Sequence, residues 1–131
     1  GKNQPDFQSV GAYDSKKKKV VFIDYSVDGL AFYSIKKPSK IKRLNLDLSS
    51  LDLGNTNGTT AGYTGQKGYE FVLLDFMSGS LHFFDRKGNP TAVSKFPGDA
   101  PMNDSFAFSF ANGHAFLYDK SDRVWYGYRV F

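Results

Sequence analysis

Residues 71–84 read FVLLDFMSGSLHFF, and the same pattern returns as VVFIDYSVDGLAFY at 20–33 and AFLYDKSDRVWYGY at 115–128. Each copy is an apolar run, an aspartate, a short polar turn and a second apolar run rich in aromatic residues. The aspartates recur at intervals of roughly 40 to 50 residues, a period typical of repeat architectures. The three hairpins therefore predict a protein built from three β repeats.

Strand-like runs separated by Gly, Asn, Asp and Pro dominate the rest of the chain, and no segment has a convincing helical periodicity. We expect one all-β domain over residues 1–131, with repeats at about 9–53, 59–97 and 105–131. The repeats hold antiparallel strands in groups of four, four and three. The expected strands are 9–14, 19–25, 30–36, 41–48, 59–65, 69–76, 81–86, 91–96, 105–110, 114–119 and 124–131.

Two architectures suit three four-stranded repeats, β-propeller blades and a β-trefoil. The second strands read VVFI, FVLL and AFLY, which are continuous apolar runs rather than alternations. Such a run indicates burial on both faces, as in stacked blades, whereas a barrel strand has a single inward face. The pattern favours propeller-like blades, with the β-trefoil as the alternative.

The second repeat, FVLLDFMSGSLHFFDRKGNPTAVSKFPG at 71–98, resembles the blades of bacterial NHL-type and TolB-like six-bladed propellers. In those blades an Asp closes the second strand, a Gly lies in the turn, and a Phe-Asp-x-x-Gly run ends the third strand. Here these features are Asp75, Gly79 and the run 84–88. In the other repeats the matching residues are Asp24 with Gly29, and Asp119 with Arg123 near the glycine position. The resemblance implies an architecture and no particular substrate.

Three blades do not close a ring. The propeller interpretation therefore predicts a partial propeller that a second copy or another chain completes. The third repeat stops before a fourth strand, which residues 2–8 or a neighbouring chain would supply. A trefoil would instead be closed and monomeric.

The net charge of +4 comes largely from two lysine-rich stretches, Lys16–Lys19 and residues 36–43. A basic patch attracts phosphate or acidic surfaces, which predicts binding to an anionic polymer as one alternative. The other interpretation is a pair of solvated turns that discourage edge-to-edge strand pairing. Neither stretch has the interleaved exposed aromatics of a base-stacking platform, which disfavours nucleic acid.

The chain has no cysteine, which excludes disulfides, and no apolar run approaches the ~20 residues of a membrane span. We expect a bacterial protein with an extracytoplasmic location, secreted or periplasmic, in which Gly1 follows a cleaved leader or a tag.

Catalytic constellations are sparse in the sequence. His82 and His114 have no second ligand at metal spacing, and no nucleophile elbow, phosphate loop or EF-hand pattern occurs. The repeated aspartates stand directly before turns, so we interpret them as turn formers rather than as a carboxylate ring. We expect no catalytic residue, metal or cofactor. The alternative is part of an enzyme whose site another chain or missing blades complete.

The principal hypothesis is a non-enzymatic, lectin-like binding or scaffold module for a glycan, a peptide or another protein. Its ligand would contact the loops between repeats, 52–58 and 97–104, and the aromatic first strands. Trp125, the only tryptophan, either stacks on a sugar ring or packs between blades. The expected ligand-binding residues are Tyr13, Asn55, Asn57, Tyr63, Asp99, Asn103, Phe110 and Trp125.

Overall fold

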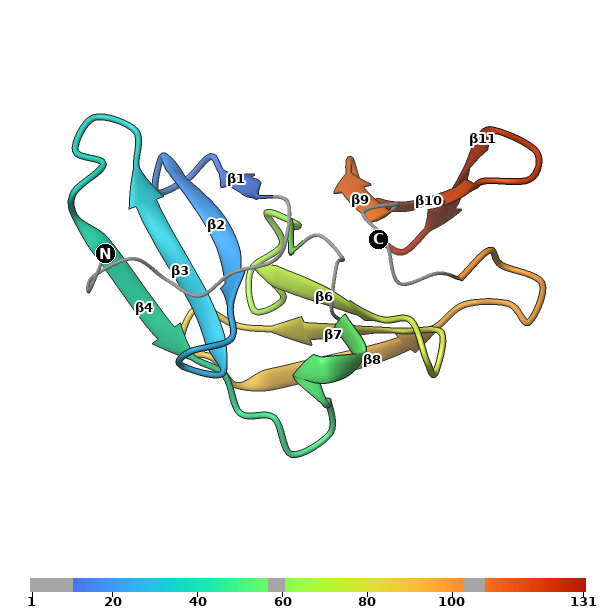
Figure 1. Cartoon of the computed structure of the whole chain (residues 1–131), viewed down its shortest axis with the longest axis horizontal. Helices are drawn as coiled ribbons and strands as arrows, with labels where there is room; N and C mark the ends of the chain where they lie inside the picture. The colour runs from blue at the N-terminus through green and yellow to red at the C-terminus, as the bar shows by residue number, and fades with distance from the viewer. Residues whose placement is uncertain (1–10, 57–60, 103–107) are drawn as a thin grey trace.

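The computed structural model describes residues 11–56, 61–102 and 108–131, which contain eleven β-strands and one turn of 3₁₀ helix (Figure 1). The strands form three separate antiparallel sheets. The first sheet holds β1 (Ala12–Asp14), β2 (Lys19–Asp24), β3 (Gly29–Ser34) and β4 (Ile41–Asn45). The middle sheet holds β5 (Gly62–Tyr63), β6 (Phe71–Asp75), β7 (Ser80–Phe84) and β8 (Pro90–Lys95). The third sheet holds β9 (Phe108–Ala111), β10 (His114–Asp119) and β11 (Val124–Arg129).

Each sheet is a meander in which strands consecutive in sequence are neighbours in space. This confirms the all-β class and the three small antiparallel sheets. The expected parts of the first strands at 9–10, 59–60 and 105–107 lie outside the described residues, as do residues 2–8. The loop expected at 52–58 contains the helical turn η1 (Leu53–Thr56). This turn is too short to produce a periodic apolar pattern in the sequence. No helix of the described part of the chain is long and apolar enough to cross a membrane.

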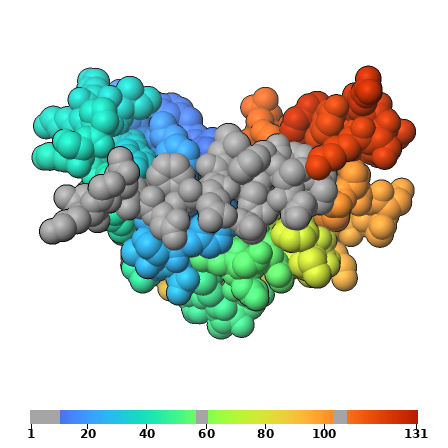
Figure 2. All heavy atoms as spheres, viewed as in Figure 1, coloured from blue at the N-terminus to red at the C-terminus, as the bar shows by residue number. Residues whose placement is uncertain are grey.

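The sheets fan out from their first strands. β5 contacts both β1 and β9, while β4, β8 and β11 lie at the far edges of their sheets. Figure 1 shows the first and third sheets at opposite ends of the molecule, with the middle sheet between them. In Figure 2 the two end sheets form separate lobes on opposite sides of the same view.

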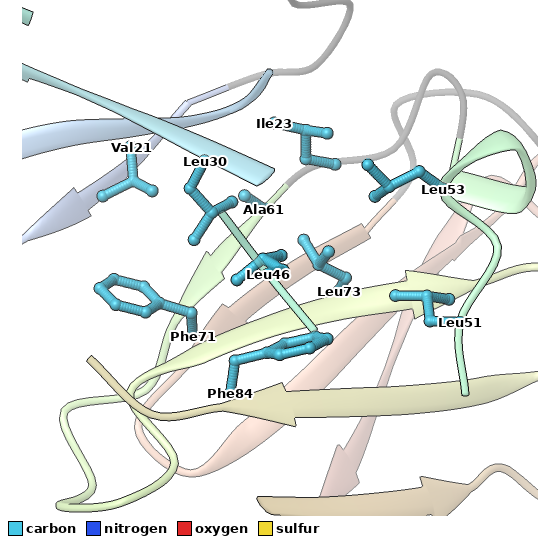
Figure 3. Close-up of a cluster of buried hydrophobic side chains, with 10 residues drawn as sticks. All are labelled: Val21, Ile23, Leu30, Leu46, Leu51, Leu53, Ala61, Phe71, Leu73 and Phe84. Atoms are coloured by element: carbon cyan, nitrogen blue, oxygen red, sulfur yellow. The ribbon is translucent and has the colours of Figure 1, made fainter. Parts of the chain in front are cut away.

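Two apolar clusters fill the spaces between the sheets. One joins the first sheet to the middle sheet and contains Ile23, Leu30 and Leu73 (Figure 3). Leu46, Leu51 and Leu53, from the segment that connects the two sheets, cover its side. The second cluster joins the middle sheet to the third sheet. Its buried members are Val72, Leu74, Leu81, Phe83, Phe96, Phe108, Ala115 and Leu117.

The middle sheet alone, among the described residues, has both faces covered. All five residues of β6 and all five of β7 are buried. In β2 and β10 burial is uneven, because the Phe22 and Phe116 side chains are only half-buried. The expectation that all three apolar runs are buried on both faces is therefore wrong for the two end sheets.

The turn between the second and third strands repeats with one backbone geometry. The residue four positions after the turn aspartate has a positive φ in each repeat: Asp28 (50°), Gly79 (68°) and Arg123 (57°). The match of Gly29 to Gly79 is thus wrong by one residue, and Gly29 instead begins β3. Gly29 is required there for another reason, because a Cβ atom would lie 1.9 Å from the carbonyl oxygen of Leu44 on the adjacent strand.

Candidate functional site

The three repeated aspartates cap their turns. One carboxylate oxygen of Asp75 accepts hydrogen bonds from the amides of Met77 and Ser78, both at 3.0 Å. Asp119 accepts from the amides of Ser121 (2.9 Å) and Asp122 (3.1 Å). The remaining turn has the same bond, from the Ser26 amide to Asp24 at 3.0 Å. The interpretation of these residues as turn formers is confirmed, since the amides that they satisfy belong to their own turns.

Asp14 makes a fourth turn of this kind, which the sequence analysis did not single out. Its Oδ1 accepts from the amides of Lys16 (3.2 Å) and Lys17 (3.1 Å), and Lys18 has a φ of 56°. The missed signal was an aspartate directly before the turn 15–18, the same local pattern as in the three hairpins.

Asp14 also joins two sheets through an ion pair. Arg86, which follows β7, donates from Nη1 to Oδ2 at 2.7 Å and from Nη2 to Oδ1 at 3.0 Å. Burial by itself would raise the pKa of Asp14, but the hydrogen bonds from Arg86 and from the Lys17 amide outweigh it. The pKa of Asp14 is therefore held below its ordinary value of 3.8. The carboxylate is fully buried, so its charge is neutralised by this bidentate partner.

A basic cleft of about 360 Å³ opens beside this ion pair, between the first and middle sheets. We call it the basic cleft and define it by its lining residues: Asp14, Lys17, Lys19, Phe32, Lys42, Arg43, Leu44, Phe71 and Arg86. Five of these side chains are cationic and one is a carboxylate. Among the described residues no ion pair involves the ammonium groups of Lys17, Lys19 and Lys42. The cleft therefore carries excess positive charge.

The apolar part of the basic cleft consists of Phe32, Leu44 and Phe71, and the two rings contact each other. The Arg86 guanidinium lies over the rings of Phe71 (5.6 Å to the centroid) and Tyr63 (5.7 Å). Phe32 meets Phe71 edge to face, with centroids 5.4 Å apart. Arg86 is held by these rings, by Asp14 and by a 3.3 Å hydrogen bond to the Tyr63 hydroxyl.

The aromatic residues expected on the first strands do converge. Tyr13, Tyr63 and Phe110 line one hollow of about 210 Å³, together with Gly11, Ala12, Ala61, Gly62 and Ser109. Tyr63 and Phe110 pack against the two apolar clusters, whereas Tyr13 is 49% exposed. The hollow thus offers a ligand one free ring rather than three.

The loop residues of the expected site lie in different surroundings. Asn55 lies in η1, where its carbonyl oxygen accepts from the Phe76 amide at 3.3 Å. Asp99 lines a separate hollow with Asp119 and Asp122, an acidic neighbourhood. Asn57 and Asn103 lie outside the described residues.

Trp125 and His114 both belong to the third sheet. The Trp125 side chain is 51% exposed on β11, and its ring lies 5.2 Å from that of Tyr118 on the adjacent strand. His114 begins β10, and its Nδ1 lies 2.9 Å from the carbonyl oxygen of Asn112.

His82 is buried inside the middle sheet. Its Nε2 lies 3.2 Å from the Ser80 hydroxyl, which in turn contacts the Ser78 hydroxyl, and Nδ1 has no hydrogen-bond partner in the described part of the chain. Burial lowers the pKa of His82, partly offset by the nearby charge of Asp75. The residues described contain no group of three or more His, Cys, Asp or Glu side chains that could hold a metal ion.

Comparison of the chain with models of protein families, with curated proteins and with solved structures finds no match.

Proposed function

We propose that this protein is a non-enzymatic binding module that takes an anionic glycan into the basic cleft. The observation that carries the proposal is the convergence of cations from both lysine-rich stretches on one concave site. Lys17 and Lys19 come from the β1–β2 turn and β2, Lys42 from β4, and Arg86 from the turn between β7 and β8. A concave site lined by one sign of charge concentrates ligands of the opposite sign.

The ion pair next to the cleft supports this proposal. Asp14 is neutralised by Arg86, so it does not compete for the three lysines. Lysines on flexible stems bind carboxylate or sulfate groups as mobile point charges, which suits a polymer with charged groups along its length. An acidic or sulfated glycan presents such groups.

The rings of the cleft favour a glycan over a nucleic acid. Single-stranded nucleic acids are bound by stacking of bases on exposed aromatic faces. Phe71 is fully buried beneath Arg86, and Phe32 packs its ring against Phe71. The anionic groups of a sugar chain need only the cations that surround these rings.

We further propose that the three sheets are blades of a β-propeller. Supporting this are the meander order of each sheet and the contacts of β5 with β1 and β9, as expected for first strands around an axis. No strand pairing joins one sheet to another in the described residues, whereas a trefoil would close its barrel by such pairing. The likeness of residues 71–98 to NHL-type and TolB-like blades agrees with this interpretation. An enzymatic role completed by another chain and an extracytoplasmic location stay predictions.

The proposal is tested by removing the three free cleft lysines together, as Lys17→Ser/Lys19→Ser/Lys42→Ser. We expect the variant to elute from immobilised heparin at clearly lower salt than the unmodified protein. In titrations of heparin, the slope of log affinity against log salt should fall by roughly one for each lost contact.

The matched control is Lys36→Ser/Lys37→Ser/Lys40→Ser, which removes the same charge from exposed residues that do not line the cleft. It should retain most heparin binding. An equal loss of heparin binding in both variants would show a delocalised charge effect and contradict the basic cleft as the binding site. Tighter binding to single-stranded DNA than to heparin would overturn the glycan class.

A further inference from the structure

His82 is a buried histidine on the face of the middle sheet that packs against the first sheet. It lies on β7 and is 5% exposed. Antiparallel pairing sets it directly opposite Leu73 of β6, and residues paired in this way share one face of a sheet. Leu73 is completely buried in the apolar cluster with Ile23 and Leu30 of the first sheet. We call this packing of the first sheet on the middle sheet the joint, and the His82 ring lies on the same face.

The two ring nitrogens of His82 have one hydrogen-bond partner between them. Nε2 lies 3.2 Å from the Ser80 hydroxyl, whereas the buried Nδ1 has no partner in the described part of the chain. A neutral imidazole has one N–H donor, but an imidazolium has two. Protonation of His82 would therefore bury a charge together with an N–H donor that has no acceptor, which costs free energy.

Few titratable groups share this face of the middle sheet with His82. From β6, Asp75 lies opposite Ser80, and its negative charge favours protonation of the ring. From β8, Lys95 also lies opposite Ser80, but its side chain is exposed and its charge is screened by solvent. Burial outweighs the charge of Asp75, so the pKa of His82 lies below its ordinary value of 6.5.

The elements packed against this face offer His82 no compensation. Among the described residues, the first sheet and the connecting segment supply these buried apolar side chains to the cluster: Val21, Ile23, Leu30, Leu46, Leu51 and Leu53. Tyr25 and Tyr63 also pack against it, but phenols titrate near pH 10 and carry no charge at about pH 5 to 7.5. Asp14 and Asp24 are buried carboxylates of the first sheet, and each is in an ion pair with an arginine.

The joint also forms the basic cleft. Phe84 lies two residues from His82 along β7 and pairs with Phe71 of β6. Phe71 lines the basic cleft, and the Arg86 guanidinium lies 5.6 Å from the centre of its ring. The cleft lysines come from the first sheet and its β1–β2 turn, whereas Phe71 and Arg86 come from the middle sheet and the turn that follows β7. The cleft therefore keeps its shape only while the joint is closed.

We propose that protonation of His82 loosens the joint and so releases an anionic glycan from the basic cleft as the medium becomes acidic. This inference rests on the proposed function, because it concerns the regulation of the same cleft. In an open joint His82 meets water and takes up a proton near pH 6.5, whereas in the closed joint it does so only at lower pH. Each pH unit below 6.5 thus favours the open joint by at most about tenfold.

The first test measures heparin affinity at pH 7.5 and at pH 5 in the same salt. We expect the unmodified protein to bind more weakly at pH 5, by up to about 30-fold for a histidine that titrates at 6.5 when exposed. Charge alone predicts the opposite, since a protein that gains protons attracts a polyanion more strongly. Equal or tighter binding at pH 5 would overturn the proposal.

Variants of the two histidines assign the effect. His82→Leu cannot titrate and matches the apolar surroundings of the ring, so its heparin affinity should not fall at pH 5. His82→Gln is a second variant without a titrating ring, in case the leucine disturbs packing. His114→Gln is the matched control, since His114 lies in the third sheet and is the only other histidine in the chain. It should lose affinity at pH 5 as the unmodified protein does, and a similar loss in His82→Leu would contradict the proposal.

Two measurements without heparin report on the joint itself. The urea midpoint should fall between pH 7.5 and pH 5 by more in the unmodified protein than in His82→Leu. In nuclear magnetic resonance the His82 ring, assigned by its persistence in His114→Gln, should titrate below pH 6.5. A ring that titrates at or above this value would overturn the proposal even if no His82 variant folds.

These results separate the inference from the proposed function. Absence of heparin binding at pH 7.5 would contradict the proposed function, and the release would be wrong with it. Binding at pH 7.5 that persists unchanged at pH 5 would leave the proposed function standing and remove only the role of His82.

Discussion

At the residue scale, Asp14 is where a local turn and a long-range contact meet. The same carboxylate caps its own turn and binds Arg86, 72 residues away in the sequence. Removal of one partner from a buried pair leaves the other charge without compensation. The Asp14–Arg86 pair therefore ties the first sheet to the middle sheet.

We expect Asp14→Asn to lower the free energy of unfolding by about 1–3 kcal/mol at pH 7. This is less than the roughly 3–5 kcal/mol of a fully buried pair, because the Arg86 side chain stays 24% exposed. The folded pKa of Asp14 lies below 3.8, so its contribution is present above that pH and is lost as the pH falls through the folded pKa.

Urea unfolding at pH 7 and at steps below pH 4 measures this effect. The difference between unmodified protein and variant should shrink as the pH falls. Asp99→Asn, a change at an exposed loop, should alter stability by less than about 0.5 kcal/mol. A difference that grows towards low pH would contradict the ion pair as the cause.

At the element scale, the aspartate turns use a backbone conformation that suits glycine, yet only one of them has it. Gly79 occupies the positive-φ position in the middle sheet, whereas Lys18, Asp28 and Arg123 occupy it elsewhere. A side chain in this region costs roughly 1–2 kcal/mol. These turns thus hold strain that a single substitution can relieve.

We expect Arg123→Gly to raise the free energy of unfolding by about 0.5–1 kcal/mol, since relief of the left-handed strain exceeds the entropy cost of glycine. The measurement is the urea midpoint. Lys120→Gly, in the same turn but without a positive φ, should instead lower stability by up to about 1 kcal/mol. Equal destabilisation of both variants would show that Arg123 holds no backbone strain that glycine can relieve.

At the scale of the whole molecule, the middle sheet holds the fold together. It contributes to both apolar clusters, while each end sheet contributes to one. Loss of a buried side chain in the middle sheet should therefore destabilise all three sheets. Unfolding should remain one transition.

We expect Leu73→Ala to lower the free energy of unfolding by about 2–5 kcal/mol, since Leu73 is completely buried between the first and middle sheets. Val93→Ala on the exposed side of β8 should cost less than about 0.5 kcal/mol. Thermal unfolding followed by circular dichroism and by Trp125 emission should give coincident transitions. Separate transitions would show that the third sheet unfolds on its own.

Much of the fold could be predicted from local pattern. The strands, their grouping and the capping role of the aspartates depend on neighbours within one hairpin, which the order of residues specifies directly. The candidate site was harder to predict from the sequence. Lysine-rich stretches were visible, but their approach to Arg86 requires two sheets to pack at a particular angle, and no local pattern encodes that angle.

The amino-acid sequence by itself determined the three hairpins, since strand alternation, turn chemistry and apolar runs act over a few residues. Only the tertiary structure decided which faces are covered. The apolar runs of β2 and β10 look like that of β6 in sequence, yet they differ in burial because β6 has a neighbouring sheet on each side. The same packing brings Lys17 and Lys42 to one cleft and leaves the Trp125 side chain exposed. The burial of a strand depends on which sheet packs against each of its faces. The assembly of the sheets decides this, not the residues of the strand itself.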